Sequence, residues 1–278
     1  MKKLYNYILL CIFFILFFLT LIFNKPKKNI SSYISGNLYI VGSSSTQQLC
    51  DDLGDEFCKL NPNTFVVKSG SGSSEAVLAV LNKSAQIGDL SRELYPTENK
   101  NLFDSHIIAK DAIAICVNKN NLIKNISFRV LKKIFQKKIT NWSELGGKNK
   151  KIILIGRDFS SGTRNAFEKH LNLSENIKYD IELENNGKVK YKIQSDEDAI
   201  GYISLSSCDE TISVLEIDGV KPSIENIMNS KYHITHPLLQ ITTKNTKDPL
   251  TSAWFSFVYS NKGAAIIKQN RFIPVSRN

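Results

Sequence analysis

Short apolar runs alternate with amphipathic segments along most of the chain, from Asn37 onward. The apolar runs carry no charge, which is typical of strands that are buried on both faces of a sheet. The amphipathic segments place apolar residues on one face at helical spacing, as Leu49, Leu53 and Phe57 do. We expect strands at residues 38–41, 65–67, 107–108, 112–117 and 152–155, and helices at residues 46–60, 75–81, 127–135, 163–170 and 249–259. Strands that alternate with helices in this way predict an α/β fold with largely parallel sheets.

The chain has 278 residues and a formal net charge of +10, from 36 Lys and Arg against 26 Asp and Glu. Its length is enough for one large or two mid-sized domains with a substantial hydrophobic core. A basic excess of this size raises the question of a nucleic-acid partner. Half of the excess, however, comes from five lysines that precede residue 29, where there is no acidic residue. Because the remaining excess is modest, we expect no nucleic-acid partner.

The first 28 residues have the character of an export segment. Two lysines near the start are followed by an apolar stretch without charge from Ile8 to Phe23. A secretory signal has an apolar middle of about 7–15 residues and a membrane-spanning helix needs about 20, so this stretch falls between the two. No Ala-x-Ala-like cleavage site follows it. We therefore expect a signal peptide or an uncleaved membrane anchor at residues 1–28, a linker at residues 29–36, and a periplasmic or otherwise extracytoplasmic location for the rest.

Four cysteines lie outside this export segment, namely Cys50, Cys58, Cys116 and Cys208. Cys50 and Cys58 share one expected helix, where a rise of about 1.5 Å per residue separates them by about 12 Å, whereas a disulfide spans at most about 7 Å between Cα atoms. No two cysteines have the Cys-x-x-Cys spacing of metal or redox sites. We expect small buried thiols, with no metal ion and no cofactor.

Three loops share one design, in which a strand ends, a turn rich in Ser, Gly and Thr follows, and a helix begins. They are residues 42–46, residues 69–74 and residues 157–164. Small residues let the backbone approach a ligand, hydroxyl groups donate hydrogen bonds, and free N–H groups at a helix start attract negative charge. A single loop of this kind is better explained by helix capping. Three of them, one with Arg157 and Arg164, indicate a site for a tetrahedral oxyanion at the carboxyl ends of the strands.

The signatures of several enzyme classes are missing. Residues 70–72 lack the third glycine of a dinucleotide-binding loop, and the chain has neither a P-loop nor a Gly-x-Ser-x-Gly elbow. His233 and His236 have no partner carboxylate motif and are expected at the surface. We therefore expect a binding protein without catalytic residues. A hydrolase with Ser73 or Ser161 as its nucleophile is the alternative from a different functional class.

Several motifs follow one another in an order that is typical of one family. The most specific are Ile-Thr-Asn-Trp-Ser-Glu-Leu-Gly-Gly at residues 139–147 and Arg-Asp-Phe-Ser-Ser-Gly-Thr at residues 157–163. Weaker ones occur at residues 41–45, 70–73, 87–92, 199–205 and 272–275. From about Leu38 to Val275 the chain resembles the periplasmic phosphate-binding proteins of Pst-type ABC importers, in the type II solute-binding superfamily.

This resemblance implies two α/β lobes joined by two crossing strands, with an anion held in the cleft between them. It implies lobe 1 at residues 37–116, lobe 2 at residues 117–236, and a return to lobe 1 with C-terminal helices at residues 237–278. The family's phosphate contacts, carried over by motif, fall on Ser44, Ser45, Thr46, Ser73, Arg157, Ser161, Gly162 and Thr163. Within the serine run at residues 43–45, the assignment is open by one position.

Arg92 departs from the family pattern and is a further candidate contact. Many relatives have Asp at this position, where it accepts a hydrogen bond from protonated phosphate and so discriminates against sulfate. If Arg92 points into the cleft, it adds a charge-assisted donor, and the alternative is a salt bridge outside the cleft. Asp89 and Asp158 are candidates for the missing acceptor. Arg164 has two similar alternatives, the rim of the cleft or an i, i+4 pair with Glu168.

The sequence thus predicts a monomeric solute-binding protein that captures inorganic phosphate by lobe closure and delivers it to the permease subunits of an ABC transporter. Sulfate or molybdate as the ligand, or a signalling role without transport, are the alternatives within the binding class. None of these functions breaks a bond.

Overall fold

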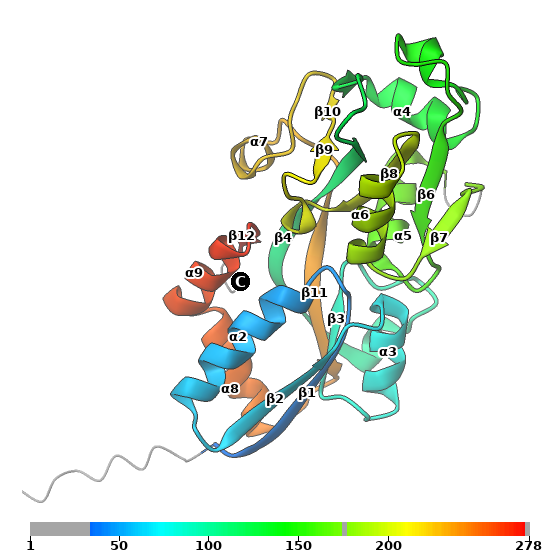
Figure 1. Ribbon diagram of the computed structural model, residues 1–278. Coiled ribbons are helices and arrows are strands. Elements are labelled where there is room, and N and C mark those ends of the chain that lie inside the picture. Colours follow the sequence, from blue (N-terminus) through cyan, green and yellow to red (C-terminus); the bar gives the residue numbers. More distant parts are fainter. Residues whose placement is uncertain (1–33, 174–176, 276–278) are drawn as a thin grey trace, which may run out of the picture. The chain divides into compact units, whose positions relative to one another are not determined.

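The computed structural model describes residues 34–173 and 177–275, which form two α/β lobes (Figure 1). This architecture confirms the fold expected from the sequence. The export segment predicted at residues 1–28 lies outside the described residues. Among the described residues, no helix is both long and apolar enough to cross a membrane.

Lobe 1 is a sheet with helices on both faces. Its strands and helices are β1 (Gly36–Gly42), β2 (Thr64–Ser69), β3 (Ile87–Leu90), α2 (Gln47–Leu60), α3 (Ser73–Leu81), α8 (Pro249–Val258) and α9 (Asn261–Gln269). β1 pairs in parallel with both β2 and β3. Leu38 and Ile40 of β1 pack with α2 and α8 around Trp254. In a separate cluster, Val77 and Val80 of α3 pack with residues of β3 and β11.

Lobe 2 repeats this arrangement around β6. Its elements are β6 (Ile153–Arg157), β7 (Ile181–Leu183), β8 (Ala199–Ser204), β9 (Ile212–Val214), α4 (Phe128–Phe135), α5 (Gly162–Leu171), α6 (Asn186–Ser195), the short η2 (Trp142–Leu145), η3 (Leu205–Ser207) and α7 (Ile224–Met228), and the paired β5 (Asn125–Ile126) and β10 (Glu216–Ile217). β6 pairs in parallel with β7 and β8. In its core Phe167 stacks on Tyr202, and Phe135 meets Phe167 edge-on.

Two long strands join the lobes: β4 (Phe103–Asn118), which follows η1 (Lys100–Leu102), and β11 (Thr235–Thr243). β4 pairs with β11 over residues 103–112 and then continues into lobe 2 beside β8 and β9. The strands expected at residues 107–108 and 112–117 are therefore parts of one strand of 16 residues. The short β12 (Ile273–Pro274) also pairs with β4.

The prediction of largely parallel sheets is wrong in the middle of the molecule. β11 runs antiparallel to β3 and β4, and β4 runs antiparallel to β8 and β9. The sheet is mixed because β4 leaves lobe 1 and β11 returns to it, so the two strands that connect the lobes run in opposite directions. The parallel pairs lie on the outer sides, and their carboxyl ends carry the three Ser/Thr-rich loops.

Candidate functional site

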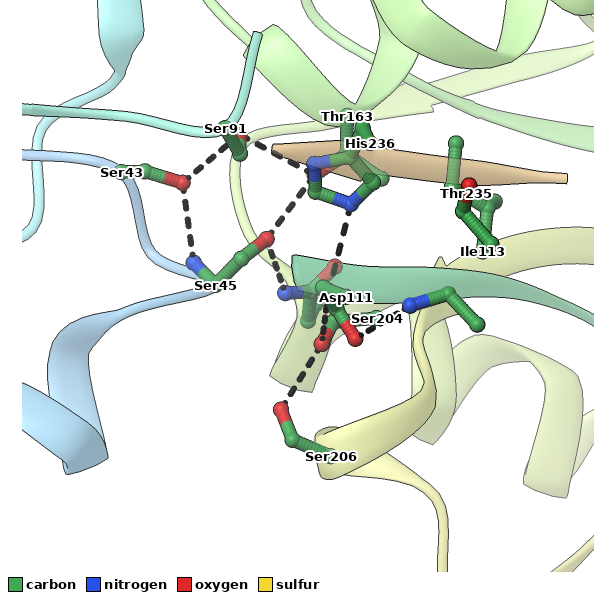
Figure 2. Close-up of polar contacts among 12 residues, drawn as sticks. Ser43, Ser45, Ser91, Asp111, Ile113, Thr163, Ser204, Ser206, Thr235 and His236 are labelled. Atoms are coloured by element: carbon green, nitrogen blue, oxygen red, sulfur yellow. Dashed lines mark hydrogen bonds and ion pairs between the residues drawn. The ribbon is translucent and has the colours of Figure 1, made fainter. Parts of the chain in front are cut away.

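Hydroxyl groups from both lobes meet where these loops face one another. Ser45 Oγ, from the loop after β1, lies 2.8 Å from Thr163 Oγ1 on the first turn of α5. Ser91, which directly follows β3, places its Oγ 3.3 Å from the same Thr163 Oγ1 and 2.9 Å from Ser43 Oγ (Figure 2). All four residues are buried. Side chains more than 100 positions apart in the sequence, Ser45 and Thr163, are therefore in direct contact.

Ser73, the first residue of α3, completes this group. Its Oγ accepts a hydrogen bond from Ser91 N at 3.1 Å and lies 3.4 Å from Ser91 Oγ. Gly162, the first residue of α5, packs against both, because an added Cβ would overlap Ser73 Oγ and would lie 2.7 Å from Ser91 Oγ. Only glycine allows this approach of the two lobes. We refer to these five hydroxyl residues as the hydroxyl cluster: Ser43, Ser45, Ser73, Ser91 and Thr163.

Two helices begin at residues of the hydroxyl cluster or directly beside it. α5 begins at Gly162 after its cap Ser161, whose Oγ accepts a hydrogen bond from Arg164 N at 3.2 Å. The first N–H groups of a helix have no acceptor within the helix and carry the positive end of its dipole. Gly162 and Thr163 supply such groups beside the cluster, and α3 begins there at Ser73. The local field therefore favours negative charge.

Arg157, the last residue of β6, is a buried cation that spans the two lobes. Its Nη2 donates to Ser44 Oγ of lobe 1 at 3.3 Å and to Glu184 O at 2.7 Å, Nη1 donates to Asn186 Oδ1 at 3.1 Å, and Nε donates to Leu183 O at 3.2 Å. All of these acceptors are neutral, and none of the ion pairs among the described residues involves Arg157. Burial lowers the pKa of this guanidinium from its ordinary value. Because arginine still keeps its proton, the charge has no counter-charge in contact.

Arg92 and Arg164 are paired with carboxylates instead. Arg92 Nη2 lies 2.7 Å from Glu98 Oε1, Nη1 lies 2.8 Å from Glu98 Oε2, and the guanidinium covers the ring of Tyr95. Arg164 Nε lies 2.8 Å from Glu168 Oε1, both residues being buried. The sequence left two alternatives for each arginine, a position at the cleft or a salt bridge. In the structure both side chains form the salt bridge.

The two aspartates that were candidates for a phosphate acceptor are engaged elsewhere. Asp89 Oδ2 accepts hydrogen bonds from Cys50 Sγ at 2.7 Å and from Thr46 Oγ1 at 3.3 Å. Burial raises the pKa of Asp89 to about 6. Asp158 Oδ1 accepts a hydrogen bond from Ser160 Oγ at 2.8 Å. Among the described residues, neither carboxylate is hydrogen-bonded to a member of the hydroxyl cluster.

Comparison with known proteins agrees with this geometry. Residues 28–262 match a family model that describes a PBP superfamily domain. A phosphate-binding protein PstS from Bacillus subtilis (strain 168) is 34% identical over 247 residues, which cover 87% of this chain and 82% of that protein. This chain belongs to the PstS family of the PBP superfamily.

Two further relatives extend the likeness. The phosphate-binding protein PstS of Borreliella burgdorferi is 28% identical over 269 residues, which cover 92% of this chain and 95% of that protein. The crystal structure of a putative phosphate ABC transporter substrate-binding protein with bound phosphate, from Clostridium perfringens, matches with a TM-score of 0.84 and 30% identity. That match covers 87% of this chain and 100% of the other.

Besides Ser43, which lies in the serine run whose assignment the sequence leaves open, two residues of the site in this PstS-family chain were not among the residues predicted from the sequence. Ser91 lies inside a family motif but had no expected role, and it contacts three members of the hydroxyl cluster. Asn186 donates from Nδ2 to Ser45 Oγ at 3.1 Å and also holds Arg157. The signal for Asn186 is present in the sequence, because the polar residues 184–187 follow a strand and start a helix, as in the other three loops.

A second buried polar group lies where the PstS-family fold passes from lobe to lobe. Asp111 on β4 is the partner of His236 on β11 in the strand register. Asp111 Oδ2 accepts a hydrogen bond from Ser204 Oγ at 2.6 Å and lies 3.3 Å from His236 Nε2 (Figure 2). The prediction that His236 lies at the surface is wrong, because its strand turns it inward toward Asp111; His233 is exposed, as predicted. These three residues link both connecting strands to β8.

A polar cavity of about 570 Å³ adjoins the hydroxyl cluster. It shares Ser44, Ser45 and Asn186 with the site and extends between the start of α2, the start of α6 and the C-terminal residues near Arg271. Hydroxyl and amide groups form much of its wall. Solvent-accessible space therefore lies directly beside two hydrogen-bond partners of Arg157.

The arrangement of this PstS-family site suits anion binding better than bond cleavage. Ser73 Oγ interacts with Ser91, and Ser161 Oγ interacts with Arg164 N. Among the described residues, neither hydroxyl is hydrogen-bonded to a His, Asp or Lys side chain that could activate it as a nucleophile. The site instead offers neutral donors around one fixed positive charge.

Proposed function

We propose that this chain is an extracytoplasmic solute-binding protein that captures inorganic phosphate between its lobes and delivers it to an ABC permease. The observation that carries the proposal is Arg157, a buried cation whose hydrogen-bond partners within residues 34–173 and 177–275 are all neutral. A buried charge without a counter-charge is costly, and an oxyanion beside it relieves that cost. The relatives support phosphate as this anion, since one is named a phosphate-binding protein and another holds bound phosphate.

The proposed contacts combine one charge with many neutral donors. The contact set keeps seven residues from the sequence and adds Ser91 and Asn186; the seven are Ser44, Ser45, Ser73, Arg157, Ser161, Gly162 and Thr163. It omits Arg92, which is paired with Glu98. It also omits Thr46, whose hydroxyl donates to Ser43 O at 2.9 Å and whose N–H donates to the same oxygen at 3.2 Å.

Lobe closure follows from the distribution of these donors. Ser45, Ser73 and Ser91 come from lobe 1, whereas Arg157 and Thr163 come from lobe 2. A complete set of donors around the anion therefore exists only when the lobes are together, as in other cleft-closing proteins. Closure also gives both lobes one defined relative position, which a permease can recognise. We propose that the protein acts as a monomer and that the N-terminal segment exports it or holds it at the membrane.

Sulfate is the second candidate, on one specific observation. Among the described residues, no carboxylate is hydrogen-bonded to the hydroxyl cluster, and the arginine at position 92 is turned to Glu98. The site therefore has no fixed acidic acceptor for the proton of hydrogen phosphate, and the serine hydroxyls must accept it. A site without such an acceptor discriminates less strongly against an unprotonated anion.

Isothermal titration calorimetry of the full chain in mild detergent separates these functions. Phosphate and sulfate are titrated in turn at pH 6 and pH 8. Phosphate binding at a single site, tighter than sulfate at both pH values, is the expected result. Sulfate binding at least as tight as phosphate would overturn the phosphate assignment, and absence of heat with both anions would overturn anion capture altogether.

A further inference from the structure

Two thiols of lobe 2 face each other in the core. Cys116 lies on β4 and Cys208 directly follows η3, and their Sγ atoms are 3.8 Å apart. Both side chains are buried. Their other contacts are weak, from Cys116 Sγ to Ala114 O at 3.6 Å and from Cys208 Sγ to Ser204 O at 3.7 Å.

The topology around β4 holds these thiols together. At Cys116, one edge of β4 pairs with β8 through Gly201, and the other edge pairs with β9 through Val214. The connection from β8 to β9, residues 205–211, therefore passes from one edge of β4 to the other, and Cys208 lies on it. Cys208 N donates to Leu205 O at 3.2 Å, which holds the backbone of this connection in a turn.

A disulfide needs only a small movement from this arrangement. Its S–S bond is about 2.05 Å long, so the two sulfur atoms would approach by about 1.8 Å from their present 3.8 Å separation. Disulfides form and persist in oxidising extracytoplasmic compartments. The export segment predicted from the sequence points to such a location for this chain.

We propose that Cys116 and Cys208 form a disulfide bond in the exported protein. One thiolate attacks a disulfide donor, either oxidised glutathione or a dithiol oxidase, and forms a mixed disulfide. The second thiolate then displaces the donor sulfur. The two protein thiols lose two electrons and two protons in total, and the donor disulfide is reduced to two thiols.

Only this pair of the described cysteines has the required geometry. Cys50 belongs to lobe 1, where its Sγ donates to Asp89 Oδ2. Cys58 lies on the same helix as Cys50 with two helical turns between them, and its Sγ is approached by Thr64 Oγ1 at 3.9 Å. These two residues therefore serve as internal controls.

The order of events follows from burial. Burial raises the pKa of the Cys116 thiol well above its ordinary value, so very little of the reactive thiolate exists in the folded chain. Exchange therefore takes place while lobe 2 is folding, and the finished bond is shielded from reductants. The bond joins positions 92 residues apart and fixes the segment at residues 206–208, which lines the cavity beside the hydroxyl cluster.

Peptide mapping under non-reducing conditions tests the proposal directly. The full chain is unfolded and reduced, refolded with a mixture of oxidised and reduced glutathione, alkylated and digested. We expect one linked peptide pair that contains Cys116 and Cys208, together with alkylated Cys50 and Cys58. Alkylated Cys116 and Cys208, or linked peptides that contain any other cysteine, would overturn the proposal.

Unfolding by urea provides an independent readout. We expect a higher midpoint for the oxidised chain than for the reduced chain, because the crosslink restricts the unfolded state. The difference should vanish in Cys116→Ala and in Cys208→Ala and persist in Cys58→Ala. An equal difference in all three variants would contradict the assignment. Neither test depends on phosphate binding, so its outcome is separate from that of the proposed function.

Discussion

Arg157 in lobe 2 and Asp89 in lobe 1 are both buried ionisable residues, and among the residues that the structure describes their hydrogen-bond partners carry no opposite charge. The guanidinium of Arg157 is held by carbonyl, amide and hydroxyl oxygens. The carboxylate of Asp89 is held by the Cys50 thiol and the Thr46 hydroxyl. Burial disfavours the charged form of each side chain. It therefore lowers the pKa of Arg157 and raises the pKa of Asp89 to about 6.

The two residues differ in how they can respond. A carboxylate can take up a proton near neutral pH and so remove its own charge. An arginine cannot lose its proton under these conditions, so only an incoming anion can compensate it. Burial of a charge without a counter-charge therefore has a different consequence at each position. At Asp89 it makes the stability of the protein depend on pH, and at Arg157 it creates a site for an anionic ligand.

The largest expected effect is the loss of binding in Arg157→Met, which keeps an unbranched side chain and removes the charge. Truncating one partner of a buried charge pair costs about 2–5 kcal/mol, which corresponds to phosphate binding weaker by roughly 30- to 5,000-fold. Calorimetry with Arg129→Met, an exposed arginine of lobe 2, is the matched control. Retention of wild-type phosphate affinity in Arg157→Met would show that Arg157 is not the residue that binds the anion.

The next effect concerns stability and the titration of Asp89. Its pKa is about 6 in the folded chain against an ordinary value of 3.8. Between these two pH values Asp89 is therefore protonated in the folded chain and ionised in the unfolded chain. The unfolding free energy should therefore fall as the pH rises from about 4 to about 6 and then stay level.

Asp89→Asn removes this titration. As the pH rises from about 4 to about 6, wild type should lose about 3 kcal/mol of unfolding free energy relative to Asp89→Asn, which has no carboxyl group to ionise at this position. Urea unfolding at several pH values measures it, with Asp158→Asn as the control. Parallel pH profiles for Asp89→Asn and wild type would show that Asp89 does not titrate as proposed.

A smaller effect is expected when the approach of the lobes is obstructed and the charge is kept. In Gly162→Ala the new methyl group would meet the Ser73 and Ser91 hydroxyls. Overpacking of this kind costs about 1–3 kcal/mol, or roughly 5- to 150-fold in phosphate affinity. Gly187→Ala is the matched control, because its added Cβ would meet only Asn185 Oδ1, at 3.3 Å. Equal affinities in the two variants would argue against closure at Gly162.

The smallest effect on binding is expected for Arg92→Met. Because Arg92 is already compensated by Glu98, phosphate affinity should change by less than about threefold, within the usual range for residues away from a site. The unfolding free energy should fall by about 1.5–3 kcal/mol, since charged hydrogen bonds are lost. A loss of affinity comparable to that of Arg157→Met would place Arg92 in the contact set.

In helix α6 the structure differs from what the local sequence pattern predicts. Val189, Tyr191 and Ile193 alternate with lysines at the spacing of a strand, and no helix was expected there. In the structure Val189 and Ile193 are buried one helical turn apart, whereas Tyr191 is 71% exposed. Packing of two residues against β8 decides the conformation, and a period of two in the sequence cannot show which residue the core will accept.

The three loops were predictable because their chemistry is local. A turn of Ser, Gly and Thr between a strand and a helix provides hydroxyl and N–H donors whatever the surroundings, and parallel strands bring such turns to the same edge of a sheet. The partners of the arginines were not predictable in this way. Glu98 and Glu168 are near in sequence to Arg92 and Arg164, but nearness alone does not separate a pair from a cleft residue.

The sequence by itself determined the α/β class, the export segment as an expectation, the anion-attracting loops and the arginines available to them. Tertiary structure decided which of these arginines is left without a counter-charge, because compensation depends on what lies within a few ångströms after folding. It also brought Ser45 to Thr163 and Cys116 to Cys208 across 118 and 92 positions. The first contact arises from how β4 and β11 join the lobes, and the second from the passage of residues 205–211 across β4. No local pattern encodes either path.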